Sequence, residues 1–340
     1  MNYNMRHSSL LVLFFLLVSL TGLSQTNDFY DDAETHDLSF PVLYIDGEVA
    51  NPGKVDFSKL PLRSVLVKED LLKEGKDQFI GAYRYEGYSL YDILNNSILQ
   101  KKNEAEFPPI IDLYVEIENT AGEKAIFSWG EIYYPIHRHE IIIASKVTRI
   151  VPSKTKELWD LPSDNKVVAA SDLLTERNIS NPVKITVRSY EGKFNIIKGM
   201  SPMFSESFTI FNGNSRTETM SKLPDQIITY RFPAVFYGRG RGIHGTTPFD
   251  GVMLKHLLEK HFAVSREYIQ KGFFVINGKD GYHGVFTYSE IMNRNDQAEF
   301  LLVPMPAKQD GGAFRIFAAA DFFSDRAINS VESITFESLK

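Results

Sequence analysis

The chain has 340 residues, of which 43% are hydrophobic and 24% charged, and it contains no cysteine. This balance is typical of a globular protein that is long enough for two hydrophobic cores. The formal net charge of −6 argues against a broad nucleic-acid-binding surface. The absence of cysteine excludes disulfides, thiolate chemistry and lipid attachment at a cysteine.

Residues 1–24 have the pattern of a secretory signal. Arg6 precedes the apolar run Leu10–Leu20, and small residues follow before Gln25. The run is short for a membrane span, and no second run of that length follows. We therefore expect an exported protein, periplasmic or secreted, without a membrane span in the mature chain; the alternative is an uncleaved anchor. Cleavage would change the net charge from −6 to −7.

The following elements are predicted in chain order from hydrophobic periodicity and turn residues. An acidic leader (25–41) precedes a strand at 42–46, a helix at 87–100, paired strands at 110–118 and 124–127, and strands at 140–144, 167–170 and 183–187. After a connector come a strand at 208–211, the strongest helix at 251–262, and strands at 272–276 and 283–287 around a turn.

The second part of the chain repeats the first. Arg315–Phe336 aligns without a gap to Lys166–Val187, with seven identities in 22 positions. Three shorter matches occur in the same order: Ser58–Pro61 with Ser221–Pro224, Gly87–Leu94 with Gly251–Leu258, and Phe127–Ile132 with Phe286–Ile291. The offset falls from 163–164 to 159 and then 149, as expected for loops of different length. We predict domains at 42–188 and 208–340, joined by a linker at 189–207.

The order of these motifs resembles the molybdopterin-binding domain of sulfite-oxidase-type oxidoreductases. The most characteristic piece is Lys279-Asp280-Gly281-Tyr282, followed by Phe286–Glu290. The resemblance covers about residues 42–187 and 208–336. It implies an α+β fold of two tandem molybdopterin-binding-like domains, with mixed β-sheets and short helices.

The resemblance also implies a molybdenum ligand that this chain lacks. Catalytic members of the family bind molybdenum through one cysteine, and the corresponding stretches Leu62–Glu86 and Asp225–Asp250 contain none. A soft thiolate suits such a metal, and serine or histidine would replace it poorly. The resemblance therefore implies either molybdopterin bound without that ligand or no cofactor.

A glycine- and arginine-rich stretch of the second copy is the first candidate site. Its glycines allow backbone amides to face an anion, and Arg239 and Arg241 can each form paired hydrogen bonds to phosphate, sulfate or carboxylate. Tyr237 and His244 lie in the same stretch, and His244 would add a pH-dependent donor. Arg315 is a further candidate for phosphate contact. The alternative is a solvated basic loop.

Two other clusters carry candidate residues. His137 and His139 would point to one face of a strand and could share a metal ion if a carboxylate such as Glu131 joined them; exposed polar positions are the alternative. Asp280 and Tyr282 lie at a hairpin tip, where Asp-Gly is also an ordinary turn.

Two residue spacings that recur in both copies indicate a structural role rather than a catalytic one. The spacing of Asp172 and Arg177, and of Asp321 and Arg326, predicts a local ion pair before the last strand of each copy. Glu131 and Glu290 are expected at helix starts.

These observations lead to three hypotheses of function. The first is an exported, non-catalytic protein that binds a small anionic molecule or an exported partner protein. The second is an oxidoreductase that retains a molybdopterin cofactor without a cysteine ligand. The third is a metal carrier that uses His137 and His139.

Overall fold

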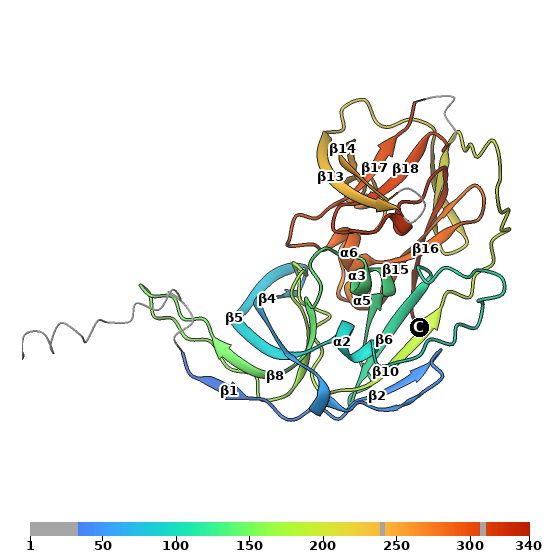
Figure 1. Cartoon of the computed structure of the whole chain (residues 1–340). Coiled ribbons are helices and arrows are strands. Elements are labelled where there is room, and N and C mark those ends of the chain that lie inside the picture. The colour runs from blue at the N-terminus through green and yellow to red at the C-terminus, as the bar shows by residue number, and fades with distance from the viewer. Residues whose placement is uncertain (1–32, 239–241, 307–310) are drawn as a thin grey trace, which may run out of the picture.

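Strands are the main secondary structure of this protein, and most of their pairings are antiparallel. The structure is a computed structural model that describes residues 33–238, 242–306 and 311–340, with the side chains of 236–238 and 242–245 outside the description (Figure 1). Strands account for 45% of the chain and helices for 11%, and four small sheets are arranged like the blades of a four-bladed β-propeller. The predicted fold class, α+β with two molybdopterin-binding-like domains, is therefore wrong.

Two of the sheets are built before residue 190, in what we call the first half. One sheet has the order β1-β8-β5-β4, with β9 also paired to β8, from β1 (Thr35–Asp37), β4 (Leu62–Lys73), β5 (Lys76–Ser89), β8 (Ile141–Arg149) and β9 (Lys166–Ala169). The other has the order β3-β2-β10-β6-β7, from β2 (Tyr44–Gly47), β3 (Gly53–Lys54), β6 (Leu113–Asn119), β7 (Lys124–Ser128) and β10 (Pro182–Ser189).

The second half, from Phe208 onward, repeats this topology. One sheet has the order β12-β11-β19-β15-β16, from β11 (Phe208–Asn212), β12 (Ser215–Met220), β15 (Gly272–Gly278), β16 (His283–Thr287) and β19 (Val331–Ser338). The other has the order β13-β14-β17-β18, from β13 (Thr229–Gly238), β14 (Gly242–Met253), β17 (Phe300–Pro304) and β18 (Phe314–Ala318). Even the one parallel pairing recurs, as β2–β10 and β11–β19.

The helices are short. They are α2 (Leu90–Leu94), α3 (Trp129–Tyr133), α4 (Leu254–Leu258), α5 (Arg266–Lys271) and α6 (Tyr288–Met292), with 3-10 turns η1 (Phe57–Lys59) and η2 (Ser324–Arg326). The helices predicted at 87–100 and 251–262 are confirmed only in part, as α2 and α4, because β5 and β14 run into the two segments and each helix ends after five residues. At Gly87 an added Cβ would lie 2.2 Å from the Ile143 carbonyl oxygen, so glycine here allows the strands to approach closely.

A pseudo-two-fold axis relates the two halves across their contact. Backbone hydrogen bonds across the contact occur in pairs whose residues are related by the sequence offsets of 159 and 149. Ile136 N–H donates to Ala320 O and Asn295 N–H to Ser171 O, both at 2.8 Å; Phe322 N–H donates to Tyr134 O at 2.9 Å and Leu173 N–H to Asn293 O at 2.8 Å. The equivalent rings of Tyr114 and Phe273 stack on each other, 5.7 Å between centroids. The halves therefore meet like the subunits of a symmetric dimer.

Candidate functional site

A cleft between the halves has a volume of about 450 Å³. It is open to the surface. From the first half it is lined by Tyr91, Glu131, Ile132, Pro135–Ile141 and Ser171, and from the second by Phe232–Ala234, Arg294, Asp296–Ala298, Phe317, Ala319 and Ala320. We call this cavity the central cleft.

The central cleft is lined by residues that the pseudo-symmetry relates. The loop 135–140 follows α3, and the loop 294–298 follows α6 at the equivalent place. The side chains at equivalent positions differ in chemistry, as His137 with Asp296, Arg138 with Gln297, and His139 with Ala298. The two walls therefore offer a ligand different polar groups.

One wall of the cleft is apolar and belongs to the β13–β14–β17–β18 sheet. Phe232 and Ala234 lie on β13, and Phe317 and Ala319 at the end of β18. Within each pair the residues alternate along the strand, so they point to the same face. The sequence analysis did not identify these four residues as candidates, although it named Tyr237 and His244, which belong to β13 and β14 of this sheet.

His139 lines the cleft from the first half and is held by contacts within that half. Its Nδ1 lies 2.9 Å from Ser89 Oγ and 3.5 Å from Asp92 Oδ2, and its ring meets the Tyr91 ring edge-on at 5.2 Å. Its φ of +68° is in the left-handed region, where a non-glycine residue needs support from its surroundings. Burial lowers the pKa of His139, which favours the neutral ring.

Arg138 and His137 stand at the rim. Arg138 Nη1 donates to Tyr91 Oη at 2.8 Å, with the guanidinium carbon 5.0 Å from the Tyr91 ring centroid. His137 is exposed. Both histidines lie in the loop before β8 rather than on a strand, and within the described ranges no group of three or more His, Asp or Glu residues could hold a metal ion. The predicted pair therefore shares a cleft without a third metal ligand.

Two more charged groups on the walls already have partners. Arg294 is nearly buried, and its Nε donates to Asp296 Oδ1 at 2.7 Å. The two side chains thus offset each other's charge. Burial raises the pKa of Glu140, and the nearby Asp296 acts in the same direction.

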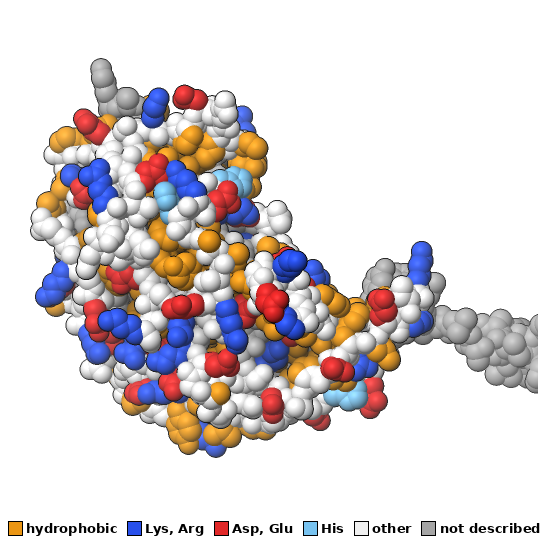
Figure 2. All heavy atoms as spheres, turned by 180° about the vertical axis from the view of Figure 1, so that it is seen from behind, with side chains coloured by type: hydrophobic (Ala, Val, Ile, Leu, Met, Phe, Trp, Pro, Cys, Tyr) orange, Lys and Arg blue, Asp and Glu red, His pale blue; other side chains and the backbone are white. Residues whose placement is uncertain are grey.

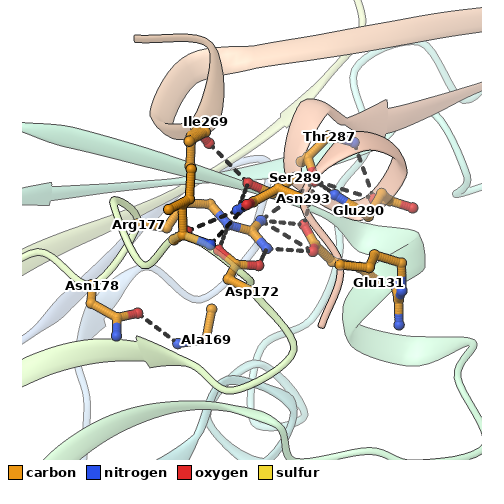
Figure 3. A network of polar contacts seen from close by, with 12 residues as sticks. Glu131, Ala169, Asp172, Arg177, Asn178, Ile269, Thr287, Ser289, Glu290 and Asn293 are labelled. Atoms are coloured by element: carbon orange, nitrogen blue, oxygen red, sulfur yellow. Dashed lines mark hydrogen bonds and ion pairs between the residues drawn. The ribbon is translucent and has the colours of Figure 1, made fainter. Parts of the chain in front are cut away.

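Beneath the cleft, a buried ionic network joins the halves (Figure 3). Arg177 contacts Asp172 at 2.6 Å and Glu131 at 2.9 Å, and Glu131 Oε1 accepts from Ser128 N–H at 2.7 Å. In the second half, Arg326 likewise binds Asp321, at 2.7 Å, and Glu290. The expected local pairs and helix-start residues are therefore confirmed.

In this network, the N-cap hydroxyl group of each half donates a hydrogen bond to the glutamate of the other half. Ser128 Oγ donates to Glu290, and Thr287 Oγ1 donates to Glu131 at 3.1 Å. Burial raises the pKa of Glu131 to about 7, while Arg177 acts in the opposite direction. Because both Glu131 oxygens already accept hydrogen bonds, this carboxylate positions the cleft rather than serving a ligand.

The remaining predicted residues lie elsewhere. Arg239 and Arg241 fall outside the described residues; Tyr237 lies in β13 and His244 in β14, with side chains outside the description. Asp280 and Tyr282 form the tight turn before β16, where Asp280 Oδ1 accepts from Tyr282 N–H at 3.0 Å. They border a separate cavity of about 240 Å³.

Arg315 lies in β18, on the strand face that carries Phe317, and is not among the residues that line the central cleft. The surface around the halves otherwise mixes acidic and basic side chains with apolar ones, as the face in Figure 2 shows. No helix in the described ranges is both long and apolar enough to cross a membrane.

The segments that the resemblance assigned to a metal-ligand loop form the β4–β5 and β13–β14 hairpins, and with no cysteine in the chain they do not fit a thiolate-bound molybdenum. No protein-family model matches the chain, and no curated protein sequence matches it.

Proposed function

We propose that this protein binds a small organic molecule in the central cleft. The observation that carries the proposal is a cavity of about 450 Å³ whose lining comes from both halves. Ligand sites are typically concave, about 300–1,000 Å³ in volume, and frequent where two structural units meet.

The lining favours a ligand with an apolar body and a polar edge. Phe232, Ala234, Phe317 and Ala319 provide the apolar wall. The loops that follow α3 and α6 bring polar groups to the rim, where His137 and the donors of Arg138 are nearest to solvent. A flat aromatic molecule would bury its rings against the wall and keep its polar substituents at the rim.

Binding is favoured over catalysis because several titratable groups of the cleft already have partners. Glu131 is saturated by Arg177 and the Ser128 amide, Arg294 is paired with Asp296, and His139 Nδ1 faces Ser89. A catalytic acid or base needs an atom that can exchange a proton with the substrate. The apolar run at 10–20 further supports a role outside the cytoplasm.

The test uses N-phenyl-1-naphthylamine, a neutral aromatic probe whose fluorescence rises in apolar surroundings. We expect saturable binding by the wild-type protein. Ala320→Phe places a ring in the cleft and should weaken binding more than about tenfold, equivalent to about 1.4 kcal/mol. The matched control is Ala121→Phe in the exposed turn between β6 and β7. Equal affinity in the two variants would place the probe outside the central cleft and contradict the proposal.

A further inference from the structure

One charged residue, Arg315, lies in an otherwise apolar cluster. The cluster is on the face of the β13–β14–β17–β18 sheet that forms the apolar wall. Its buried members are Phe249, Leu301, Val303 and Phe317, with Tyr230, Phe232, Ala234, Met253, Met305 and Ala319 packed around them. By strand alternation, Arg315 lies on this face with Phe317 and Ala319. It is the one charged side chain that alternation places there among the described positions of the four strands.

Arg315 is oriented by an aromatic ring rather than by a carboxylate. Its guanidinium carbon lies 5.1 Å from the centroid of Phe249, which stacks on Phe317 at 4.0 Å and an interplanar angle of 8°. The Phe317 ring in turn lines the central cleft. The N–H donors of a guanidinium lie in one plane, so a cation held over a ring can still offer donors to a ligand.

The charge of Arg315 lacks a partner in the described parts of the chain. Its Nε is buried and has no hydrogen-bond acceptor there. Burial lowers the pKa of the Arg315 guanidinium, and no carboxylate among the described residues opposes that effect. An arginine in this situation differs from Arg177, Arg294 and Arg326, each of which has an acidic partner. A partly buried guanidinium without such a partner favours an anionic ligand.

We infer that Arg315 binds the anionic group of the ligand whose apolar body occupies the central cleft. The inference rests on the proposed function and adds the chemical class: an aromatic carboxylate, sulfonate or phosphate. Positions two apart on a strand are separated by about 7 Å. A compact ligand can therefore cover Phe317 with its ring while its anionic oxygen atoms reach Arg315.

Two probes that differ by one anionic group test this assignment. N-phenyl-1-naphthylamine is neutral, and 8-anilinonaphthalene-1-sulfonate has the same aromatic frame with a sulfonate. We expect Arg315→Gln to weaken binding of the sulfonate about tenfold to a hundredfold, the range of a charge-assisted hydrogen bond, and to leave binding of the neutral probe unchanged. Arg315→Lys should restore part of the affinity, because the positive charge remains.

Two other arginines make the result specific. Arg231→Gln is the control, because Arg231 is paired with Asp250 on the outer face of the hairpin. Arg138→Gln tests the rim. If Arg138→Gln, and not Arg315→Gln, weakens the sulfonate, the anion binds at the rim and the inference is wrong.

The remaining outcomes separate this inference from the proposed function. Unchanged sulfonate binding in Arg315→Gln, with normal binding of the neutral probe, overturns the inference and leaves the cleft as a binding site. Failure of both probes to bind the wild-type protein overturns the proposed function and the inference with it. Far-ultraviolet circular dichroism of each variant shows whether the sheets are intact.

Discussion

At the scale of single residues, His283 shows how burial and one hydrogen bond fix a protonation state. Its Nδ1 lies 2.8 Å from the Gly281 carbonyl oxygen, which can only accept, so Nδ1 carries the proton. The ring stacks on Phe107 at 4.0 Å, and Nε2 is buried without a hydrogen-bond partner in the described chain. Burial lowers the pKa of His283 to about 4. The imidazole is therefore neutral in the folded protein.

This predicts a loss of stability in acid. An unfolded histidine has a pKa of about 6.5, so between pH 6.5 and 4 the unfolded chain binds a proton that the folded one excludes. The contribution of His283 to stability is complete above about pH 6.5 and falls by about 3 kcal/mol as the pH falls to 4. Urea denaturation at a series of pH values measures this dependence.

The comparison with His283→Gln isolates the contribution of this residue. Asp112 and Glu131, whose pKa values are raised by burial, shift the pH dependence in the opposite sense and remain in both proteins. The variant should therefore lose less stability than wild type between pH 6.5 and 4. Identical slopes for both proteins would show that His283 titrates normally.

At the scale of elements, α3 and α6 depend on each other. Each has only five residues, too few for a helix that is stable alone. Each begins with a capping box, Ser128 with Glu131 and Thr287 with Glu290, and each cap hydroxyl also donates to the glutamate of the other half. The two helix starts therefore form as a pair.

Removal of one buried arginine should be strongly destabilising. Arg326→Met leaves Asp321 and Glu290 buried without their cation, which we expect to lower the free energy of unfolding by about 3–5 kcal/mol. Arg231→Met, in an exposed ion pair with Asp250, should change it by about 1 kcal/mol or less. Guanidinium denaturation measures both variants. A loss below 1 kcal/mol for Arg326→Met would show that the network adds little to stability.

Some of these elements could be predicted from the sequence. Alternation along 110–118 and 124–127 predicted β6 and β7, and the five-residue spacing from Asp172 to Arg177 predicted their ion pair. The helices at 87–100 and 251–262 were overpredicted: α2 ends at Leu94, although the apolar spacing continues to Ile98. β5 extends to Ser89 because it pairs with β8, and sequence periodicity does not reveal this pairing.

The central cleft could be predicted only in part. His137 and His139 drew attention as a pair, yet their neighbours Asp296 and Phe232 come from segments about 100 or more residues away in sequence. The repeat offset of 159 aligned the loops that follow α3 and α6, although alignment alone does not place two copies face to face. The contact between halves had to come from the structure.

At the scale of the whole molecule, the two halves should unfold together. They share the ionic network, paired backbone bonds, and a small core of Tyr114, Ile126, Phe273, Val275 and Val285. Both tryptophans, Trp129 and Trp159, lie in the first half, whereas far-ultraviolet circular dichroism reports both halves. We expect the two signals to have the same urea midpoint. Separate midpoints would mean that the halves are independently stable.

Fusion of two similar halves in one chain has a further consequence for the cleft between them. In a pair of identical subunits, every substitution near their two-fold axis occurs in both subunits, so the two walls of a shared site keep the same composition. In this chain the two walls differ: Ala298 and Gln297 stand where the other wall has His139 and Arg138. A single polypeptide can therefore shape this site for a molecule that has two unlike ends and a defined direction of entry.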